Sequence, residues 1–333
     1  MTGAGSNRAA TPSDGMGPGP APRQGWTHWV LYALIGLGLV GILVTSRTGG
    51  GVVLYCAQDQ VFAEPLLAEF TARTGIPVRP VFDSEAVKTV GLANRLLAER
   101  GHPVCDVYWG NEELRARQLA ASGVFEATNG WAAFGHRSRS LVVRTNSAGL
   151  PDGFVPPRSL VELTNAAFRG RVSMAFPLFG TTAAHLLALR QHWGESNWLA
   201  WCRALAANAP FLEEGNSHVV RRVARGEAWV GMTDSDDIVS GQREGLPVAA
   251  LPPFPESLLI PNTVALVAKT GGPSPAARQL FEYLQSPAVL SALIAAGALD
   301  SNAPAATAVQ PDWTRLVSEL GVATEQLAEV FRR

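Results

Sequence analysis

Short apolar runs alternate with amphipathic segments along the chain from about residue 51 onward. The runs 52–56 (VVLYC), 78–82 (VRPVF) and 104–109 (VCDVYW) are bounded by polar, glycine or proline residues and predict buried strands. The patterns at 61–73, 87–100 and 112–122 predict helices, because each is followed by a glycine of the kind that ends helices. Strands and helices that alternate in this way indicate βαβ units and a parallel sheet.

The alternation continues through the rest of the chain. Further strands are expected at 140–144, 171–176, 228–232 and 262–269, and further helices at 182–193, 197–207, 217–225, 236–244, 275–285, 287–296 and 313–331. We therefore expect an α/β fold of two lobes, each a doubly wound sheet with flanking helices. Residues 51–143 plus 262–333 are expected to form lobe 1 and residues 144–261 lobe 2, so that the chain crosses between them near 140–146 and 255–263.

The N-terminal part has a different composition. Residues 1–25 are rich in Gly, Pro, Ala and Ser and are predicted to be disordered. The apolar run that follows predicts either a transmembrane anchor at 26–46 or a cleaved signal sequence, and its length favours the anchor. Under either interpretation the rest of the chain is exported, to the periplasm or another extracytoplasmic space, and an anchor at 26–46 would hold it at the cytoplasmic membrane.

Composition excludes several classes of function. The formal net charge is -1 and no basic cluster is present, so we expect no nucleic-acid partner. No G-x-S-x-G, H-E-x-x-H or P-loop motif occurs, and we predict neither an enzyme nor a resident cofactor. Cys56 and Cys105 would lie about 10 Å apart along neighbouring strands, too far for a disulfide, so buried free thiols are expected. A monomer is expected.

Carboxylates gather in the loops where chemistry is expected. Open α/β sheets bind ligands beyond the carboxyl ends of their strands. The windows 57–60, 83–85, 110–113, 177–182, 213–217 and 233–237 hold ten of the chain's 28 acidic residues and no lysine or arginine. Part of this enrichment is ordinary helix capping, since acidic residues favour first turns. The pattern nevertheless predicts a cationic ligand or a ligand with a cationic portion.

Two helix starts predict an anion seat instead. Gly180, Thr181 and Thr182 precede a helix, where free N–H groups and hydroxyls suit a phosphate or carboxylate. Plain N-capping by Thr181 or Thr182 is the alternative, and Asn216 and Ser217 offer a similar start, with Asn216 as the cap. Acidic loops opposite such a seat suit a zwitterion or a metal ion carrying a bound anion.

The stretch GMTDSDDIVSG (231–241) places three aspartates directly after an apolar strand. An EF-hand is excluded, because Val239 stands where that loop requires glycine. Asp234 is expected to be an N-cap, and Asp236 and Asp237 suit the first turn of a helix. Capping alone does not need three aspartates, so we interpret the stretch as a helix cap that also forms half of a cation site.

Several stretches resemble the solute-binding proteins of ABC importers, in the iron(III)-, thiamine- and aminoethylphosphonate-receptor group. They are VVLYCAQDQVFAEPLLAEFTARTGIPV, FDSEAVKTVGLANRLLAE, CDVYWGNEELRARQL, FPLFGTTAAHLLAL, GNSHVVRRVARGEAWVGMTDSDD and IPNTVALV, and they span about residues 51–302. The resemblance implies a type II periplasmic-binding-protein fold whose two lobes close on a ligand. It also implies delivery of that ligand to a membrane permease.

The resemblance also implies which positions bind the ligand. Iron receptors of the group carry adjacent tyrosines where this chain has Asp236 and Asp237, so iron(III) would have to be bound by other hard oxygen ligands. With Glu112, these two aspartates are the candidate metal ligands. The candidate ligand-binding residues are Gln58, Asp59, Ser84, Glu85, Asn111, Glu112, Gly180, Thr181, Thr182, Asn216, Ser217, Asp234, Asp236 and Asp237.

The sequence therefore predicts an exported receptor for a cation or cation-bearing small ligand. The transported ligand would be a metal ion such as iron(III), or a small molecule like thiamine or aminoethylphosphonate. The expected partner is an ABC importer permease, and no cofactor is required. The alternative is a membrane-tethered enzyme or sensor that uses the same cleft.

Overall fold

The structure is a computed structural model that describes residues 51–82, 88–301 and 308–332. The predicted disordered segment 1–25 and the predicted anchor or signal sequence 26–46 lie outside the described residues. Within the described ranges, no helix is both long enough and apolar enough to cross a bilayer.

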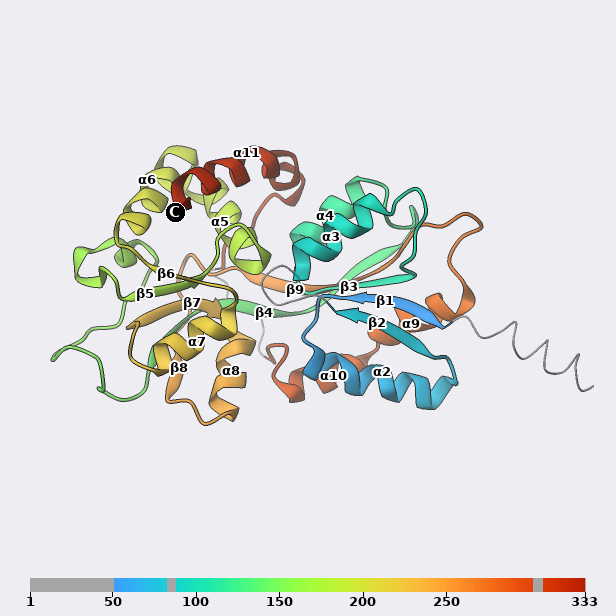
Figure 1. Cartoon of the computed structure of the whole chain (residues 1–333), viewed down its shortest axis with the longest axis horizontal. Coiled ribbons are helices and arrows are strands. Elements are labelled where there is room, and N and C mark those ends of the chain that lie inside the picture. The colour runs from blue at the N-terminus through green and yellow to red at the C-terminus, as the bar shows by residue number, and fades with distance from the viewer. Residues whose placement is uncertain (1–50, 83–87, 302–307, 333) are drawn as a thin grey trace, which may run out of the picture. The chain divides into compact units, whose positions relative to one another are not determined.

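Lobe 1 is built on a sheet with strand order β2-β1-β3-β9-β4. Its strands are β1 (Val52–Cys56), β2 (Val78–Phe82), β3 (Val107–Gly110), β9 (Leu259–Leu266) and the first part of β4 (Trp131–Arg144). Helices α3 (Lys88–Ala98) and α4 (Glu113–Ala121) lie on one face, and α2 (Gln60–Thr74), α9 (Pro275–Leu284) and α10 (Pro287–Ala296) on the other (Figure 1). Apolar side chains of β1, β3 and β9 fill both interfaces.

Lobe 2 repeats this arrangement with the order β4-β7-β5-β6, and β8 pairs with β4 as well. Its strands are the second part of β4, β5 (Val172–Ala175), β6 (Phe211–Glu213), β7 (Val230–Asp234) and β8 (Val248–Ala250). Helices α5 (Gly180–Trp193) and α6 (Glu195–Ala207) cover one face, and α7 (Asn216–Ala224) and α8 (Ser235–Arg243) the other (Figure 1). Two 3-10 helices, η1 (Val161–Thr164) and η2 (Ala166–Phe168), precede β5. The predicted two-lobed α/β fold is confirmed.

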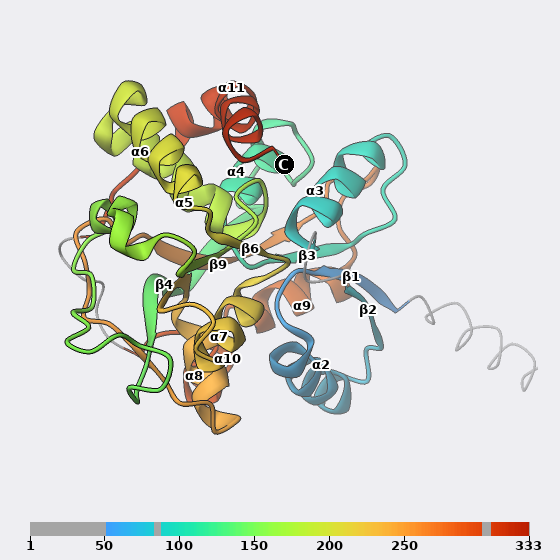
Figure 2. The same ribbon diagram turned by 60° about the vertical axis from the view of Figure 1, so that its left-hand side comes forward.

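Strand β4 belongs to both lobes. Residues 131–138 pair with β9, and residues 139–144 pair antiparallel with β7 and β8. The register with β9 shifts between Phe134 and Arg137, where Gly135 adopts a φ of 55° that favours glycine. Figure 2 shows β4 and β9 running from one lobe into the other. This shared strand carries residues directly from one sheet to the other.

Helix α11 (Trp313–Phe331) packs against α5 and α6 of lobe 2 and also against α4 of lobe 1. Leu316, Leu320 and Leu327 belong to the same buried cluster as Trp198 and Met174 of lobe 2. The lobe boundaries remain a proposal, and this packing favours assigning α11 to lobe 2 although the sequence placed residues 262–333 in lobe 1.

Some local predictions differ from the structure. Strands β6 and β8 and the first half of β4 were not expected, because each is short or carries as many polar as apolar residues. The cysteine prediction is confirmed, since Cys56, Cys105 and Cys202 are buried and free. Strand β1 pairs with β3 as expected. Cys56 lies opposite Trp109, whereas the expected partner was the preceding residue, Tyr108.

Candidate functional site

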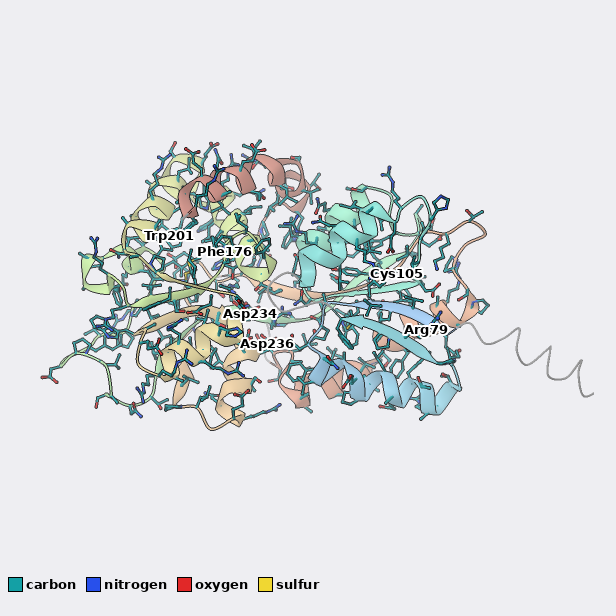
Figure 3. The ribbon with its side chains drawn as sticks, in the orientation of Figure 1. Arg79, Cys105, Phe176, Trp201, Asp234 and Asp236 are labelled. Carbon is teal, nitrogen blue, oxygen red and sulfur yellow. The ribbon has the colours of Figure 1, made fainter. Side chains whose placement is uncertain are left out.

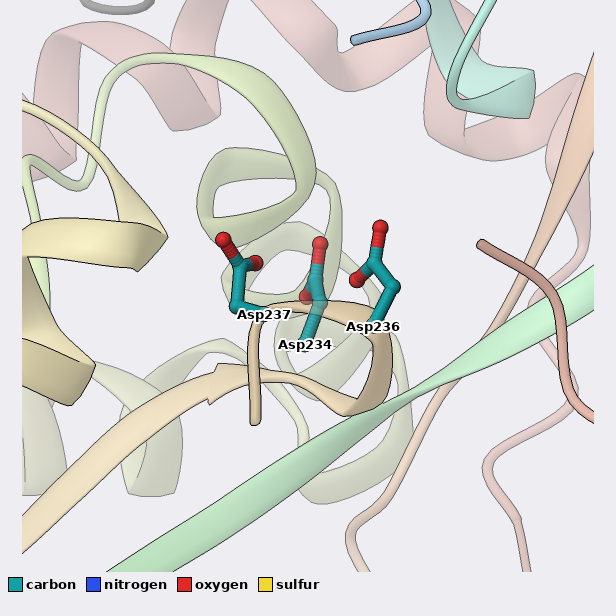
Figure 4. A group of neighbouring side chains, drawn as sticks. All are labelled: Asp234, Asp236 and Asp237. Carbon is teal, nitrogen blue, oxygen red and sulfur yellow. The ribbon is translucent and has the colours of Figure 1, made fainter. Parts of the chain in front are cut away.

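Three aspartates cluster where β7 ends and α8 begins. Asp234 is the last residue of β7, and Asp236 and Asp237 lie in the first turn of α8. One carboxylate oxygen from each lies within 4.8 Å of the other two, and the three side chains project to the same side of the ribbon (Figure 4). Asp234 and Asp236 lie near the junction of the two lobes (Figure 3). The predicted carboxylate cluster thus forms at the expected end of the strand.

Asp234 does not act as the predicted helix cap. It occupies the N-cap position of α8, but its side chain bonds no N–H group of that helix. The carboxylate accepts hydrogen bonds from Arg139 Nη1 (2.6 Å), Thr181 Oγ1 (2.8 Å) and Asn216 Nδ2 (3.1 Å). Arg137 Nε lies 3.3 Å from the same carboxylate. These stronger charge-assisted contacts hold the Asp234 side chain away from the N–H groups of α8. Asp234 therefore links β4, α5 and α7 through buried hydrogen bonds.

Two buried arginines of β4 therefore reach the site that the sequence predicted to be free of basic residues. Arg137 Nε lies 3.3 Å from Asp236 Oδ2 as well as from Asp234, and Arg137 Nη1 donates to Asn262 Oδ1 (3.2 Å). Because neighbours two apart on a strand share a face, Arg137 and Arg139 point to the same side of β4. The expectation of a crevice without arginine is wrong, because the counted loop windows did not include this strand.

The arginines and carboxylates shift each other's proton affinity. Burial alone would raise the pKa of Asp234, but Arg139 and Arg137 outweigh it and hold that pKa below its usual value. Burial would lower the pKa of Arg137, and the surrounding carboxylates of Asp236, Asp234, Asp59 and Asp237 raise it instead. Asp234 and Arg137 are therefore held in their charged forms at neutral pH.

The helix starts of lobe 2 lack side-chain caps. Helix α5 follows Phe179 and helix α7 follows Gly215, and neither N-cap residue makes a side-chain cap bond. Thr181 instead donates to Asp234, so the capping alternative for Thr181 is wrong. Asn216 is the first residue of α7 rather than its cap, and it also donates to Thr181 Oγ1 (3.1 Å).

Thr182 is a second hydroxyl at the start of α5. It is buried, and Thr182 Oγ1 has no hydrogen-bond partner among the described residues. Together with Gly180, whose φ is 55°, it leaves the first turn of α5 with polar groups that no side chain caps. Free N–H groups at a helix start favour an anion, so an anion seat at this turn stays a prediction.

Lobe 1 contributes fewer groups than predicted. Gln58, which follows β1, accepts a hydrogen bond from Asn262 Nδ2 (3.0 Å), and Asn262 in turn accepts one from Arg137. Asp59 is half-buried at the N-cap position of α2 and makes no cap bond, and Asn111 is buried. A continuous polar chain thus runs from Gln58 of lobe 1 to Asp234 of lobe 2.

Glu112, predicted as a metal ligand, is the N-cap of α4. Its carboxylate accepts from Leu114 N (2.6 Å) and Arg115 N (3.0 Å). Burial raises the pKa of Glu112 to about 7, against the opposing effects of Arg115 and these N–H groups. Capping accounts for its position, and a metal role for Glu112 has no support in this geometry.

His185 is a buried histidine whose two ring nitrogens both have hydrogen-bond partners. Its ring Nδ1 lies 3.4 Å from Arg139 Nε, and its Nε2 lies 2.5 Å from the carbonyl oxygen of Glu256. Since Arg139 can only donate, Nδ1 accepts and Nε2 donates, which fixes a neutral ring. Burial and the neighbouring Arg139 lower the pKa of His185 to about 3. It is a support for Arg139, as expected for a satisfied core histidine.

The structure brings most of the predicted residues together. Asp234, Asp236, Asp237, Thr181, Thr182, Gly180 and Asn216 lie on the adjoining ends of β7, α5, α7 and α8. Ser217 follows Asn216 in α7, whereas Ser84 and Glu85 lie outside the described residues. Arg137, Arg139 and Asn262 also belong to this polar network but were not predicted from the sequence as site residues. The spacing R-S-R, separated by one serine from the apolar run LVV, was the available signal, since it places two arginines on one face of a strand.

Comparisons with known proteins agree with this architecture. The family described as "Bacterial extracellular solute-binding protein" matches residues 52–298. Iron-bound HitA from Pseudomonas aeruginosa is 17% identical with a TM-score of 0.69, over 84% of this chain and 99% of its own. AfuA from Actinobacillus pleuropneumoniae, with exogenous fructose-6-phosphate bound, is 17% identical with a TM-score of 0.72, over 85% of this chain and 98% of its own.

A ferric binding protein from Campylobacter jejuni gives a similar result, with 15% identity and a TM-score of 0.68, over 84% of this chain and 99% of its own. No curated protein matches the sequence. These likenesses show a type II periplasmic-binding-protein fold, and the family match covers most of the described chain. The chain therefore belongs to the bacterial extracellular solute-binding proteins and is extracytoplasmic.

Proposed function

We propose that this receptor captures a positively charged or zwitterionic small solute, or a hard metal ion, between its two lobes. It would deliver the solute to the permease of an ABC importer. The apolar segment 26–46 would hold it at the membrane, as the sequence predicts. The site residues proposed for the solute are those at the ends of β1 and β3 and at the starts of α5, α7 and α8.

The charge around Arg137 carries this proposal. Four carboxylates raise its pKa, namely those of Asp59, Asp234, Asp236 and Asp237. The guanidinium groups of Arg137 and Arg139 balance two of them, so four negative and two positive charges leave a net charge of −2. Glu112, whose pKa is about 7, adds up to one more negative charge. A solute that brings positive charge to this place is favoured by the field of these groups.

The start of α5 supports a second, acidic group on the solute. Thr182 Oγ1 and the uncapped turn of α5 lie in the same lobe as Asp236 and Asp237. A zwitterion would place its cationic end at the aspartates and its acidic end at this turn. A metal ion would use Asp236 and Asp237, whose hard oxygens suit iron(III) or a similar cation, and would carry its anion to α5. Asp234 is committed to Arg139 and is not proposed as a ligand.

A thermal-shift panel tests the proposal on the purified protein. It compares iron(III) citrate, divalent metal ions, thiamine, aminoethylphosphonate and spermidine with inorganic phosphate and a sugar phosphate. A bound solute stabilises the fold by about 2.7 kcal/mol at a hundredfold excess over its Kd. We expect stabilisation by at least one cation or zwitterion, and Asp237→Asn should weaken it about tenfold. Asp152→Asn, an exposed aspartate in a loop, is the matched control. If only the simple anions stabilise the protein, the proposal is wrong.

A further inference from the structure

Helix α8, which carries Asp236 and Asp237, is fastened at both ends to lobe 1. At its start, Ser235 Oγ donates to Asp300 Oδ1 (2.7 Å). Asp300 follows α10, and its other oxygen accepts from Ser138 Oγ of β4 (2.7 Å). Ser138 N also donates to Ser235 Oγ (3.0 Å). One carboxylate of lobe 1 therefore ties the first turn of α8 to the strand that both lobes share.

The far end of α8 is fastened to the same part of lobe 1. Arg243 Nη2 donates to the carbonyl oxygen of Ala295 (2.9 Å), and Arg243 Nη1 donates to that of Ala296. These carbonyls end α10, where a cation is favoured by the helix dipole. Between the two ends, a Cβ on Gly297 would meet Val239 Cγ1 at 2.6 Å, so α8 approaches the end of α10 more closely than any other residue would allow.

These contacts lie on the side of β4 away from the aspartate–arginine network. Arg137 and Arg139 face Asp234, whereas Ser138 between them faces Asp300. A cavity of about 460 Å³ lies beside the contacts, lined by residues of both lobes that include Ser138, Ser235, Val239, Gly297 and Asp300. Because the surroundings are hollow, these few hydrogen bonds, rather than a continuous core, hold the lobes together on this side.

We propose that Asp300 is a positioning residue and that the α8–α10 contact is the pivot about which the lobes close. The α8–α10 contact comprises Ser235, Val239 and Arg243 of α8 with Ala295, Ala296, Gly297 and Asp300. By holding Ser235, Asp300 fixes Asp236 and Asp237 relative to the ligand groups of lobe 1. The lobes then close by rotation about this contact, and on the opposite side α3 and α4 shift against α5 and α11, which they contact. The positioning of the two aspartates rests on the proposed function, whereas the pivot does not.

Distances between the lobes test the pivot without any ligand. Spin labels at Val61→Cys in α2 and Val161→Cys in η1 report on lobes 1 and 2, because both valines are exposed and the three native cysteines are buried. With Asp300 intact, double electron–electron resonance should give one narrow distance distribution. Asp300→Ala should broaden it, and so should Ser235→Ala and Arg243→Gln, which change the contact from the other lobe. Asp312→Asn, an exposed cap of α11, is the control.

Binding of terbium(III), a hard cation whose luminescence reports occupancy, tests the positioning role. Asp300→Ala should weaken its binding about tenfold, the effect of losing one hydrogen bond to a charged group. Ser235→Thr, which keeps the hydroxyl, should retain the affinity of the unaltered chain. Unchanged distance distributions in all three contact variants would overturn the inference. Failure of the unaltered chain to bind any cation overturns the proposed function instead, and the distances still decide the pivot.

Discussion

Arg139 donates a hydrogen bond of 2.6 Å to Asp234, and each of these side chains is only 1% exposed. This pair joins the middle of β4 to the end of β7, and it is surrounded by Thr181, Asn216 and His185. A buried ion pair contributes little net stability, because its attraction offsets the cost of taking both charges out of water. It does, however, fix the place of the aspartate cluster relative to the strand.

Removing Arg139 alone should lower the free energy of unfolding more than removing the charges of both Arg139 and Asp234. Arg139→Met leaves Asp234 buried without its closest cation, and we expect a loss of about 3–5 kcal/mol in the free energy of unfolding. The double variant with Asp234→Asn should recover part of that loss, because no charge then remains unpaired. Urea unfolding measures both. Arg73→Met, in an exposed pair with Glu69, is the control and should cost under about 1 kcal/mol. Equal losses in the single and double variants would contradict the coupling.

Glu112 should give the stability a defined dependence on pH. Burial raises its pKa to about 7 from an ordinary value of 4.5, so the folded state binds a proton that the unfolded state releases between these values. The stabilising contribution is complete below about pH 4.5 and is lost as the pH rises through 7, on the order of 3 kcal/mol in all. Glu112→Gln should flatten the unfolding free energy over this window, since its amide oxygen still accepts from α4. An unchanged slope between pH 5 and 8 would rule out Glu112 as the source.

Substitutions of the two threonines at the start of α5 should affect different quantities, one the affinity for the solute and the other the free energy of unfolding. Thr182→Val removes a buried hydroxyl that has no partner among the described residues, so the free energy of unfolding should change by less than about 1 kcal/mol. Affinity for a solute with an acidic group should fall about tenfold if that hydroxyl meets it. Thr181→Val is the matched comparison and should destabilise the fold by about 1–3 kcal/mol, because it removes a hydrogen bond to Asp234. Calorimetric titration and urea unfolding give the two quantities.

The start of α11 should contribute to stability through stacking. The guanidinium of Arg117 lies between two indole rings, 5.3 Å from the centroid of Trp131 and 5.7 Å from that of Trp313. Trp313→Ala should lower the free energy of unfolding by about 1–2 kcal/mol, through lost contact area and one cation–π contact. Trp313→Phe should restore part of it. Val322→Ala on the exposed face of the same helix should stay within about 0.5 kcal/mol.

The periodicity of apolar residues was sufficient to predict the lobes and most of their elements. Strands β1 and β2 and helix α11 begin and end where the pattern placed them, because their apolar residues face a core on a regular period. The first half of β4 has glycine, histidine, arginine and serine in eight residues and has no such pattern. Its pairing with β9 is decided by contacts with a strand more than a hundred residues away, which a local pattern does not contain.

The candidate site was predictable to the same extent, because its local features were predicted and its long-range contacts were not. Asp236 and Asp237 were placed correctly in the first turn of α8 and Asp234 at its N-cap position, because a strand followed by a helix is a local feature. The partners of Asp234 lie between 18 positions (Asn216) and 97 positions (Arg137) from it in the sequence, and their convergence depends on the order of the strands. Local capping preference also misassigned Asp234 and Asn216, because two buried arginines offered these polar groups stronger partners than a helix N–H.

Strand β4 is a member of both sheets, and this has a consequence for how the protein melts. Neither sheet keeps its full set of strands if the other comes apart, since residues 131–138 complete one and residues 139–144 the other. The lobes therefore lack the independence of domains joined by a flexible linker. The described part of the chain should lose its structure in one cooperative transition, with a calorimetric enthalpy equal to the van't Hoff enthalpy.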